Sequence, residues 1–129
     1  MTNPIGQKIL IIEDNVIAQK LIQLLLDDQG FITNIASNGT HALELISKNH
    51  YKLILLDINL PDIDGFTLAK LIRSKENYLN IIKKSIIIGM SASSSDKYAK
   101  LLMDSDINKF IEKPLTKESL NKITSDTFN

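Results

Sequence analysis

Five polar side chains of this sequence stand directly after short apolar runs. They are Glu13, Asp14, Asp57, Ser91 and Lys113. A carboxylate at the end of a buried strand needs water, a metal or a ligand beside it, because an unpaired buried charge is very costly. Ligands of open α/β sheets bind at the carboxyl ends of the strands. We therefore expect these five side chains to form one site, with Asp57 open to the incoming ligand.

The residue types of this site suit phosphoryl transfer. Three neighbouring carboxylates raise one another's proton affinity, and a hard divalent cation such as Mg²⁺ or Mn²⁺ relieves that repulsion while leaving positions open for phosphate. Asp57 is a candidate nucleophile, as carboxylates are in aspartyl-phosphate chemistry. Lys113 offers a compact positive charge and Ser91 a hydroxyl donor for phosphoryl oxygens. Catalysis of this reaction consists mostly of positioning and charge neutralisation.

The surrounding pattern alternates strand and helix. The strand-like runs are Lys8–Glu13, Ile32–Ser37, Leu53–Asp57, Ser85–Ser91 and Lys109–Lys113. Four are almost wholly apolar, as expected where helices cover both faces of a parallel sheet, and the more polar second run indicates an edge strand.

Apolar residues at helical spacing follow each strand, and Gly30 is a candidate stop for the first helix. The stripes are Ile17, Leu21, Leu24 and Leu25; Ala42, Leu45 and Ile46; Leu68, Leu71 and Ile72; Tyr98, Leu101 and Leu102; and Leu120 with Ile123. This alternation predicts an α/β fold, a doubly wound three-layer sandwich with right-handed crossovers.

Composition limits the classes of function. The 129 residues suit one domain, which we expect at residues 8–129 after a polar lead-in at 1–7. Lys and Arg number 15, as do Asp and Glu, so the balance favours neither nucleic-acid binding nor a membrane surface. No cysteine is present, which excludes disulfides and fits a reducing cytosol. We expect a cytoplasmic protein.

Longer segments of the sequence resemble the receiver domain of two-component response regulators. They are Lys8–Asn15, Leu55–Gly65, Gly89–Ala92 and Lys109–Pro114. The resemblance implies a (βα)5 flavodoxin-like fold with strand order 2-1-3-4-5, phosphorylated on one aspartate by a histidine kinase or a histidine-phosphotransfer protein. By position, Asp57 matches the phosphoacceptor, Glu13 and Asp14 the acidic metal-binding pair, and Asn59 the residue whose backbone carbonyl completes the metal shell.

The same resemblance assigns switching and docking residues. Ser91 matches the hydroxyl residue that contacts the phosphoryl group, Lys113 the site lysine, and Phe110 the aromatic switch position, where tyrosine is common. Without a hydroxyl, the inward and outward orientations of Phe110 differ less in solvation, so we expect weaker directional switching. The expected docking residues for the phosphodonor are Val16, Ile17, Ala18, Pro114 and Leu115. Ile17 has a competing assignment as a core residue, which the apolar stripe slightly favours.

Three alternatives remain at this level. A haloacid-dehalogenase-like phosphatase also uses an aspartyl phosphate, but it needs a second aspartate where Asn59 stands, and an amide is no general acid. A degenerate receiver would serve only as a protein-binding module. Each polar residue taken singly also has a structural explanation, for example Asp57 as a turn initiator. The sequence distinguishes neither a stand-alone regulator from a piece of a hybrid kinase nor a monomer from a weak homodimer.

Overall fold

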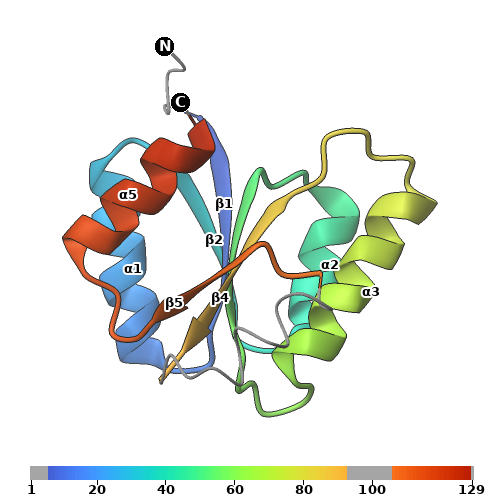
Figure 1. The fold of residues 1–129 in the computed structure, drawn as a ribbon, viewed down its shortest axis with the longest axis horizontal. Coiled ribbons are helices and arrows are strands. Elements are labelled where there is room, and N and C mark those ends of the chain that lie inside the picture. The colour runs from blue at the N-terminus through green and yellow to red at the C-terminus, as the bar shows by residue number, and fades with distance from the viewer. Residues whose placement is uncertain (1–5, 93–105, 129) are drawn as a thin grey trace.

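The structure, a computed structural model, describes residues 6–92 and 106–128 (Figure 1). In that part of the chain five strands alternate with four helices, none of which is long and apolar enough to cross a membrane. The strands are β1 (Lys8–Ile12), β2 (Ile32–Ala36), β3 (Leu53–Asp57), β4 (Ile86–Ser91) and β5 (Lys109–Glu112), and the helices are α1 (Val16–Asp28), α2 (Gly39–Lys48), α3 (Gly65–Tyr78) and α5 (Lys117–Phe128). The helix expected around Tyr98, Leu101 and Leu102 lies outside the described residues.

All four strand pairings are parallel, and the strands follow the order β2-β1-β3-β4-β5. This confirms the predicted fold class and topology. The half-exposed β2 forms one edge, as its polar sequence indicates, whereas every residue of the central strand β3 is buried. The register pairs Ile12 with Leu56 and Asp57 with Met90, so the carboxyl ends of the central strands lie side by side.

Helices cover both faces of the sheet. Helices α1 and α5 lie on one face and α2 and α3 on the other (Figure 1). Because successive side chains of a strand point to opposite faces, each strand feeds two cores. Leu10 and Leu56 pack with the α2 and α3 side chains, and Ile11 and Leu55 pack with those of α1 and α5. Burial of each such side chain contributes about 1.5–3 kcal/mol to the stability of the fold. This packing holds the sheet that carries the site in place.

Most of the predicted helix stripes face the core. Ala42 and Ile46 of α2, Leu68 and Ile72 of α3, and Leu120 and Ile123 of α5 are buried. Leu71 is the exception in α3, with 42% of its surface exposed.

The predicted stripe of α1 is wrong for three of its four residues, because only Leu25 packs against the core, whereas Ile17, Leu21 and Leu24 are exposed. The helix buries Gln19, Ile22 and Leu26, whereas Ile17 is 80% exposed and therefore is not a core residue. Apolar residues lie nearly all round this helix, so the periodicity of the sequence leaves its rotation ambiguous. The polar side chain of Gln19 settles the rotation, because its Nε2 donates to the Glu13 carbonyl and to Ser37 Oγ.

Polar side chains cap the first turns of helices that begin at the carboxyl edge of the sheet. Asn15 and Asp64 accept hydrogen bonds from backbone N–H groups in the first turns of α1 and α3. Such caps contribute about 1 kcal/mol each and fix the loops that follow β1 and β3. At the other end of α1, Gly30 adopts φ 94°, the left-handed stop expected from the sequence.

One arginine gathers several chain segments at the opposite end of α3. Arg73 Nη1 contacts Glu76 Oε1 at 2.8 Å and the Ser85 carbonyl at 2.8 Å. Its Nε donates to the Asp106 carbonyl at 3.1 Å and its Nη2 to Asn108 Oδ1 at 2.7 Å. Glu76, 3% exposed, also accepts from the Ser85 N–H. This Arg73 network joins α3 to the starts of β4 and β5.

Candidate functional site

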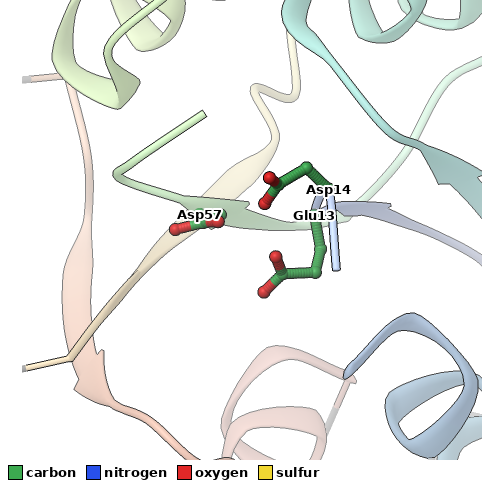
Figure 2. A group of neighbouring side chains, drawn as sticks. All are labelled: Glu13, Asp14 and Asp57. Atoms are coloured by element: carbon green, nitrogen blue, oxygen red, sulfur yellow. The ribbon is translucent and has the colours of Figure 1, made fainter. Parts of the chain in front are cut away.

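Three carboxylates converge at the carboxyl edge of the sheet (Figure 2). Glu13 and Asp14 follow β1, and Asp57 ends the neighbouring strand β3, so the parallel register brings them together. One carboxylate oxygen from each residue lies within 4.8 Å of those from the other two. Glu13 and Asp57 are buried, whereas Asp14 is exposed. This placement agrees with the convergence expected from the sequence.

Lys113 supplies the positive charge of the cluster. Its Nζ lies 2.7 Å from Glu13 Oε1 and 3.2 Å from Asp57 Oδ1. Burial by itself would lower the pKa of this lysine, but the hydrogen bond to Glu13 and the charges of Asp57 and Glu13 outweigh it, so its pKa is raised. The residue follows β5, its backbone N–H donates to the Ser91 carbonyl at 2.7 Å, and its bond to Pro114 is cis.

Asp57 is held by the loop that follows it. The Asn59 N–H donates to Asp57 Oδ1 at 3.0 Å, so that oxygen has both a hydrogen bond and the lysine beside it. Asp57 is only 3% exposed, less open than we expected of a nucleophile. A bridge between Asn59 and Asp64 folds the loop back on itself. The loop and Lys113 thus cover most of the Asp57 carboxylate.

A second acidic residue fastens this loop to α2. Asp62 Oδ1 accepts from the Gly39 N–H at 3.0 Å and its Oδ2 from the Thr40 N–H at 3.2 Å. The hydrogen bond from Gly39 is the main reason that the pKa of Asp62 is lowered. Asp62 and Asp64 thus shape the loop by capping the first turns of α2 and α3.

Two residues that sequence reasoning missed support Glu13. The Asn15 N–H donates to Glu13 Oε2 at 3.1 Å, and Gln19 binds the Glu13 backbone carbonyl. With Lys113 on Oε1, both carboxylate oxygens of this buried side chain have partners. The capping pattern of Asn15 was a readable signal, whereas nothing in the sequence marked a buried glutamine.

Ser91 and Phe110 lie on the neighbouring strands β4 and β5. Ser91 is buried at the carboxyl end of β4, next to β3 and its terminal Asp57. The half-buried ring of Phe110 lies against Gly89, whose missing Cβ would be 2.6 Å from Phe110 Cε1. Its centroid is 5.8 Å from that of Phe66. Phe110 thus points inward in this structure.

Most of the predicted docking residues share one surface. Ile17, Ala18, Pro114 and Leu115 line a cavity of about 360 Å³ between α1 and the loop after β5. Val16, 61% exposed, lies beside Ile17 at the start of α1 but does not line the cavity. Glu13 and Lys113 belong to the lining too, so this docking cavity is continuous with the acidic cluster.

The acidic cluster fits a small divalent cation. Mg²⁺ binds oxygen ligands at about 2.0–2.1 Å, so opposed ligands are about 4.2 Å apart. One oxygen from each of the three carboxylates lies within 4.8 Å of the other two, so these oxygens are near enough to be drawn around one ion. Asp14 is exposed, which leaves the solvent side of the cluster open for water or phosphate ligands.

Comparison with known proteins identifies the family. The family model of the response regulator receiver domain matches residues 9–125, and the chain belongs to this family. The chain is 34% identical over 117 residues to hybrid signal transduction histidine kinase B of Dictyostelium discoideum, a match that covers 84% of this chain and 6% of that protein.

Two solved structures share the fold closely. One is the receiver domain of the Saccharomyces cerevisiae response regulator Ssk1, in complex with the histidine phosphotransfer protein Ypd1, with 27% identity, TM-score 0.86 and coverage of 95% of this chain and 89% of that one. The other is the receiver domain of the sensor histidine kinase PA1611 of Pseudomonas aeruginosa, with a magnesium ion in its active site cleft, 27% identity, TM-score 0.81 and coverage of 95% and 98%. The chain is therefore a receiver domain of two-component signalling, a signalling module by class.

Proposed function

We propose that this receiver domain takes a phosphoryl group from a phosphohistidine donor onto Asp57. The observation that carries the proposal is the convergence of Glu13, Asp14 and Asp57 around one point, with Lys113 Nζ in contact with two of them. The magnesium ion in the PA1611 receiver supports the same chemistry here. On this proposal the domain catalyses only its own phosphorylation and dephosphorylation.

Each residue has a definite part in the transfer. The Asn59 N–H and Lys113 hold Asp57 Oδ1, which leaves Oδ2 to attack phosphorus. The new bond joins Oδ2 to phosphorus as the phosphorus–nitrogen bond of phosphohistidine breaks. The electron pair of the broken bond goes to that nitrogen, and the proton on the other ring nitrogen stays in place, so histidine leaves as neutral imidazole. Lys113 and Ser91 then stabilise the phosphoryl oxygens, because a cation and a hydroxyl donor complement their negative charge.

We propose that Glu13, Asp14, Asp57 and the Asn59 carbonyl hold Mg²⁺ or Mn²⁺. The ion supplies positive charge between the carboxylates and the transferred group when it is bound. Asn15 and Gln19 orient Glu13 for this purpose through its side chain and its backbone. Lys113 must loosen its contact with Glu13 as the phosphoryl group enters, because the same ammonium group serves both.

The proposed donor is a histidine kinase or a histidine-phosphotransfer protein that docks on α1. Ile17 and Val16 are exposed apolar side chains, and the docking cavity beside them leads directly to Lys113. The complex of Ypd1 with the Ssk1 receiver supports this mode of docking. The chain covers 6% and 10% of the lengths of the first two curated relatives, so the activity and partners of a whole protein are part of the proposal. We propose that residues 8–129 form the receiver domain, after the lead-in at 1–7. We also propose that it acts in the cytoplasm, where kinases use ATP.

We propose that Ser91 and Phe110 form the switch. A phosphoryl group on Asp57 draws the Ser91 hydroxyl toward it, and the space vacated beside β4 changes the balance of Phe110 orientations. Since Phe110 carries no hydroxyl to solvate, we expect its outward state to gain less than a tyrosine would.

The deciding experiment is incubation with acetyl phosphate and Mg²⁺, followed by intact-mass measurement. Wild-type protein should gain one phosphoryl group, and Asp57→Asn, which folds with nearly the same shape, should gain none. Asn59→Asp is the matched test of the phosphatase alternative, because it restores the acid which that mechanism requires. Mass gain on Asp57→Asn, or sustained turnover of a phosphate ester by the wild type, would overturn the assignment. A wild type that binds its donor but takes no phosphoryl group would indicate the protein-binding module instead.

A further inference from the structure

A second cavity lies at the opposite edge of the sheet from Asp57. It has a volume of about 780 Å³, within the range of ligand pockets, and its lining includes residues at the amino ends of β3, β4 and β5. In a parallel sheet these ends meet at one edge. The connection between α3 and β4 and the carboxyl end of α5 both lie at this upper edge of the molecule (Figure 1). We refer to it as the amino-edge cavity.

Positive charge dominates the amino-edge cavity. Its lining carries Lys52, Lys83, Lys84 and Lys109, against a single carboxylate, Asp126. Within residues 6–92 and 106–128, no carboxylate lies within 4.0 Å of any of these four ammonium groups, whereas Asp126 is 3.9 Å from Lys122. The chain as a whole is neutral, so this concentration of cations is local. Unneutralised lysines in one concave surface attract an anionic partner.

The cavity also offers apolar surface. Ile86, which is partly exposed, lines it among the lysines, and the largely buried Ile88 and Ile123 complete the apolar part of the lining. Ile82, in the same connection as Lys83 and Lys84, is 94% exposed, the highest value among the exposed large apolar side chains of the described chain. The phosphate backbone of a nucleic acid gains no binding energy from contact with isoleucine. A peptide with an apolar side chain gains binding energy by burying that side chain against it. The combination therefore favours a peptide over a nucleic acid.

We propose that the amino-edge cavity docks an acidic segment of a partner protein, in which carboxylates flank a bulky apolar side chain. The carboxylates pair with Lys52, Lys83 and Lys109, and the apolar side chain packs on Ile86 and the exposed Ile82. Because the acidic cluster lies at the other edge of the sheet, this docking leaves Asp57 and α1 accessible. The receiver therefore binds its phosphodonor and this second partner at the same time.

The test is titration of the ¹⁵N-labelled chain with a capped octapeptide that has Leu-Phe at its centre and carboxylate residues on both sides. Amide shifts should change at residues 50–52, 82–88 and 108–109, with saturation below about 1 mM. A peptide with amides in place of the carboxylates is the matched control and should bind at least about tenfold more weakly. Raising the salt concentration should weaken binding of the acidic peptide, because exposed charges are screened.

Variants assign the binding to the cavity. Lys83→Glu with Lys109→Glu should weaken the acidic peptide at least about tenfold, whereas Lys70→Glu, on α3 outside the lining, should change it less than about twofold. Asp57→Asn should bind like the wild type, so failure of this proposal is distinct from failure of phosphorylation. No binding by about 1 mM, equal binding of both peptides, shifts confined to α1, or tighter binding of a labelled single-stranded DNA would each overturn the proposal.

Discussion

Substituting Gly89 by alanine tests the close fit between β4 and Phe110, the proposed switch residue. The new Cβ would lie 2.6 Å and 2.7 Å from two carbons of the Phe110 ring and 3.0 Å from Ile58 Cδ1. Carbon atoms prefer separations of about 3.5–4.0 Å, so the ring must move by about 1 Å or rotate outward. The variant therefore acts on the ring without changing it.

The expected cost follows from two opposing contributions. Forcing an extra methyl group into a packed site costs about 1–3 kcal/mol. Alanine in a strand is favoured over glycine by about 0.5–1 kcal/mol, so the free energy of unfolding should fall by a net of up to about 2.5 kcal/mol. In a Phe110→Ala background the ring is gone and only the flexible Ile58 methyl remains, so Gly89→Ala should there be neutral or stabilising.

Urea unfolding of the four proteins, followed by circular dichroism, completes the double-mutant cycle. We expect a coupling energy of about 1–3 kcal/mol between positions 89 and 110. If Gly89→Ala costs the same with and without the Phe110 ring, or stabilises the otherwise wild-type protein, then the ring does not occupy the space beside Gly89 and the reasoning fails.

Three further outcomes follow from the structure. Lys113→Ala leaves the buried Glu13 without its cation. Because Lys113 is 29% exposed, we expect the free energy of unfolding, measured with a chelator present, to fall by about 2–3 kcal/mol, less than for a fully buried pair. Millimolar Mg²⁺ should recover part of this loss, and equal losses with chelator and with Mg²⁺ would contradict the metal assignment. Asp62 has a lowered pKa in the folded chain, so its hydrogen bonds stabilise the fold above the ordinary value of 3.8 and this contribution is lost as the pH falls through the lower folded value. Asp62→Asn should therefore flatten the acid limb of a stability profile between pH 7 and pH 2, and a profile unchanged from wild type would count against it. On α1, Leu26→Ala should cost about 2–5 kcal/mol in thermal or urea unfolding, whereas Leu24→Ala should cost under about 0.5 kcal/mol; the reverse ranking would show that the helix is rotated.

The strands and the site were readable because their signals are local and redundant. The apolar runs before Glu13, Asp57, Ser91 and Lys113 are too short to be buried helices, so they predict buried strands. The polar residue after each run is expected at the edge of the sheet, where a ligand can meet it. The register then follows from the parallel order, which is why Glu13, Asp14 and Asp57 meet as predicted. The roles of these residues remain proposals, but their meeting point was predictable from type and position.

The rotation of α1 was not readable, for the opposite reason. Ile17, Leu21 and Leu24 form as good a stripe as Ile22 and Leu26, and the exposed set is the more regular of the two. Only the tertiary contacts of Gln19 with Glu13 and Ser37 choose between them. The contacts of Asp62 with α2 were not readable either, because its partners Gly39 and Thr40 are distant in sequence and no pattern links them to it.

The Arg73 network gives β5 a fixed end. The guanidinium ties Asp106 and Asn108 to α3, so the strand is anchored where it begins. Its carboxyl end is held by the ladder with β4 and by the Lys113 N–H bond to the Ser91 carbonyl. The four residues of β5 span about 13 Å at 3.3 Å each. A tilt of about 5° about the anchored end would carry the far end through about 1 Å, comparable to the movement by which an ammonium group exchanges one oxygen partner for another. A displacement of the Arg73 network would therefore reach Lys113 along β5, from the edge of the sheet opposite the acidic cluster.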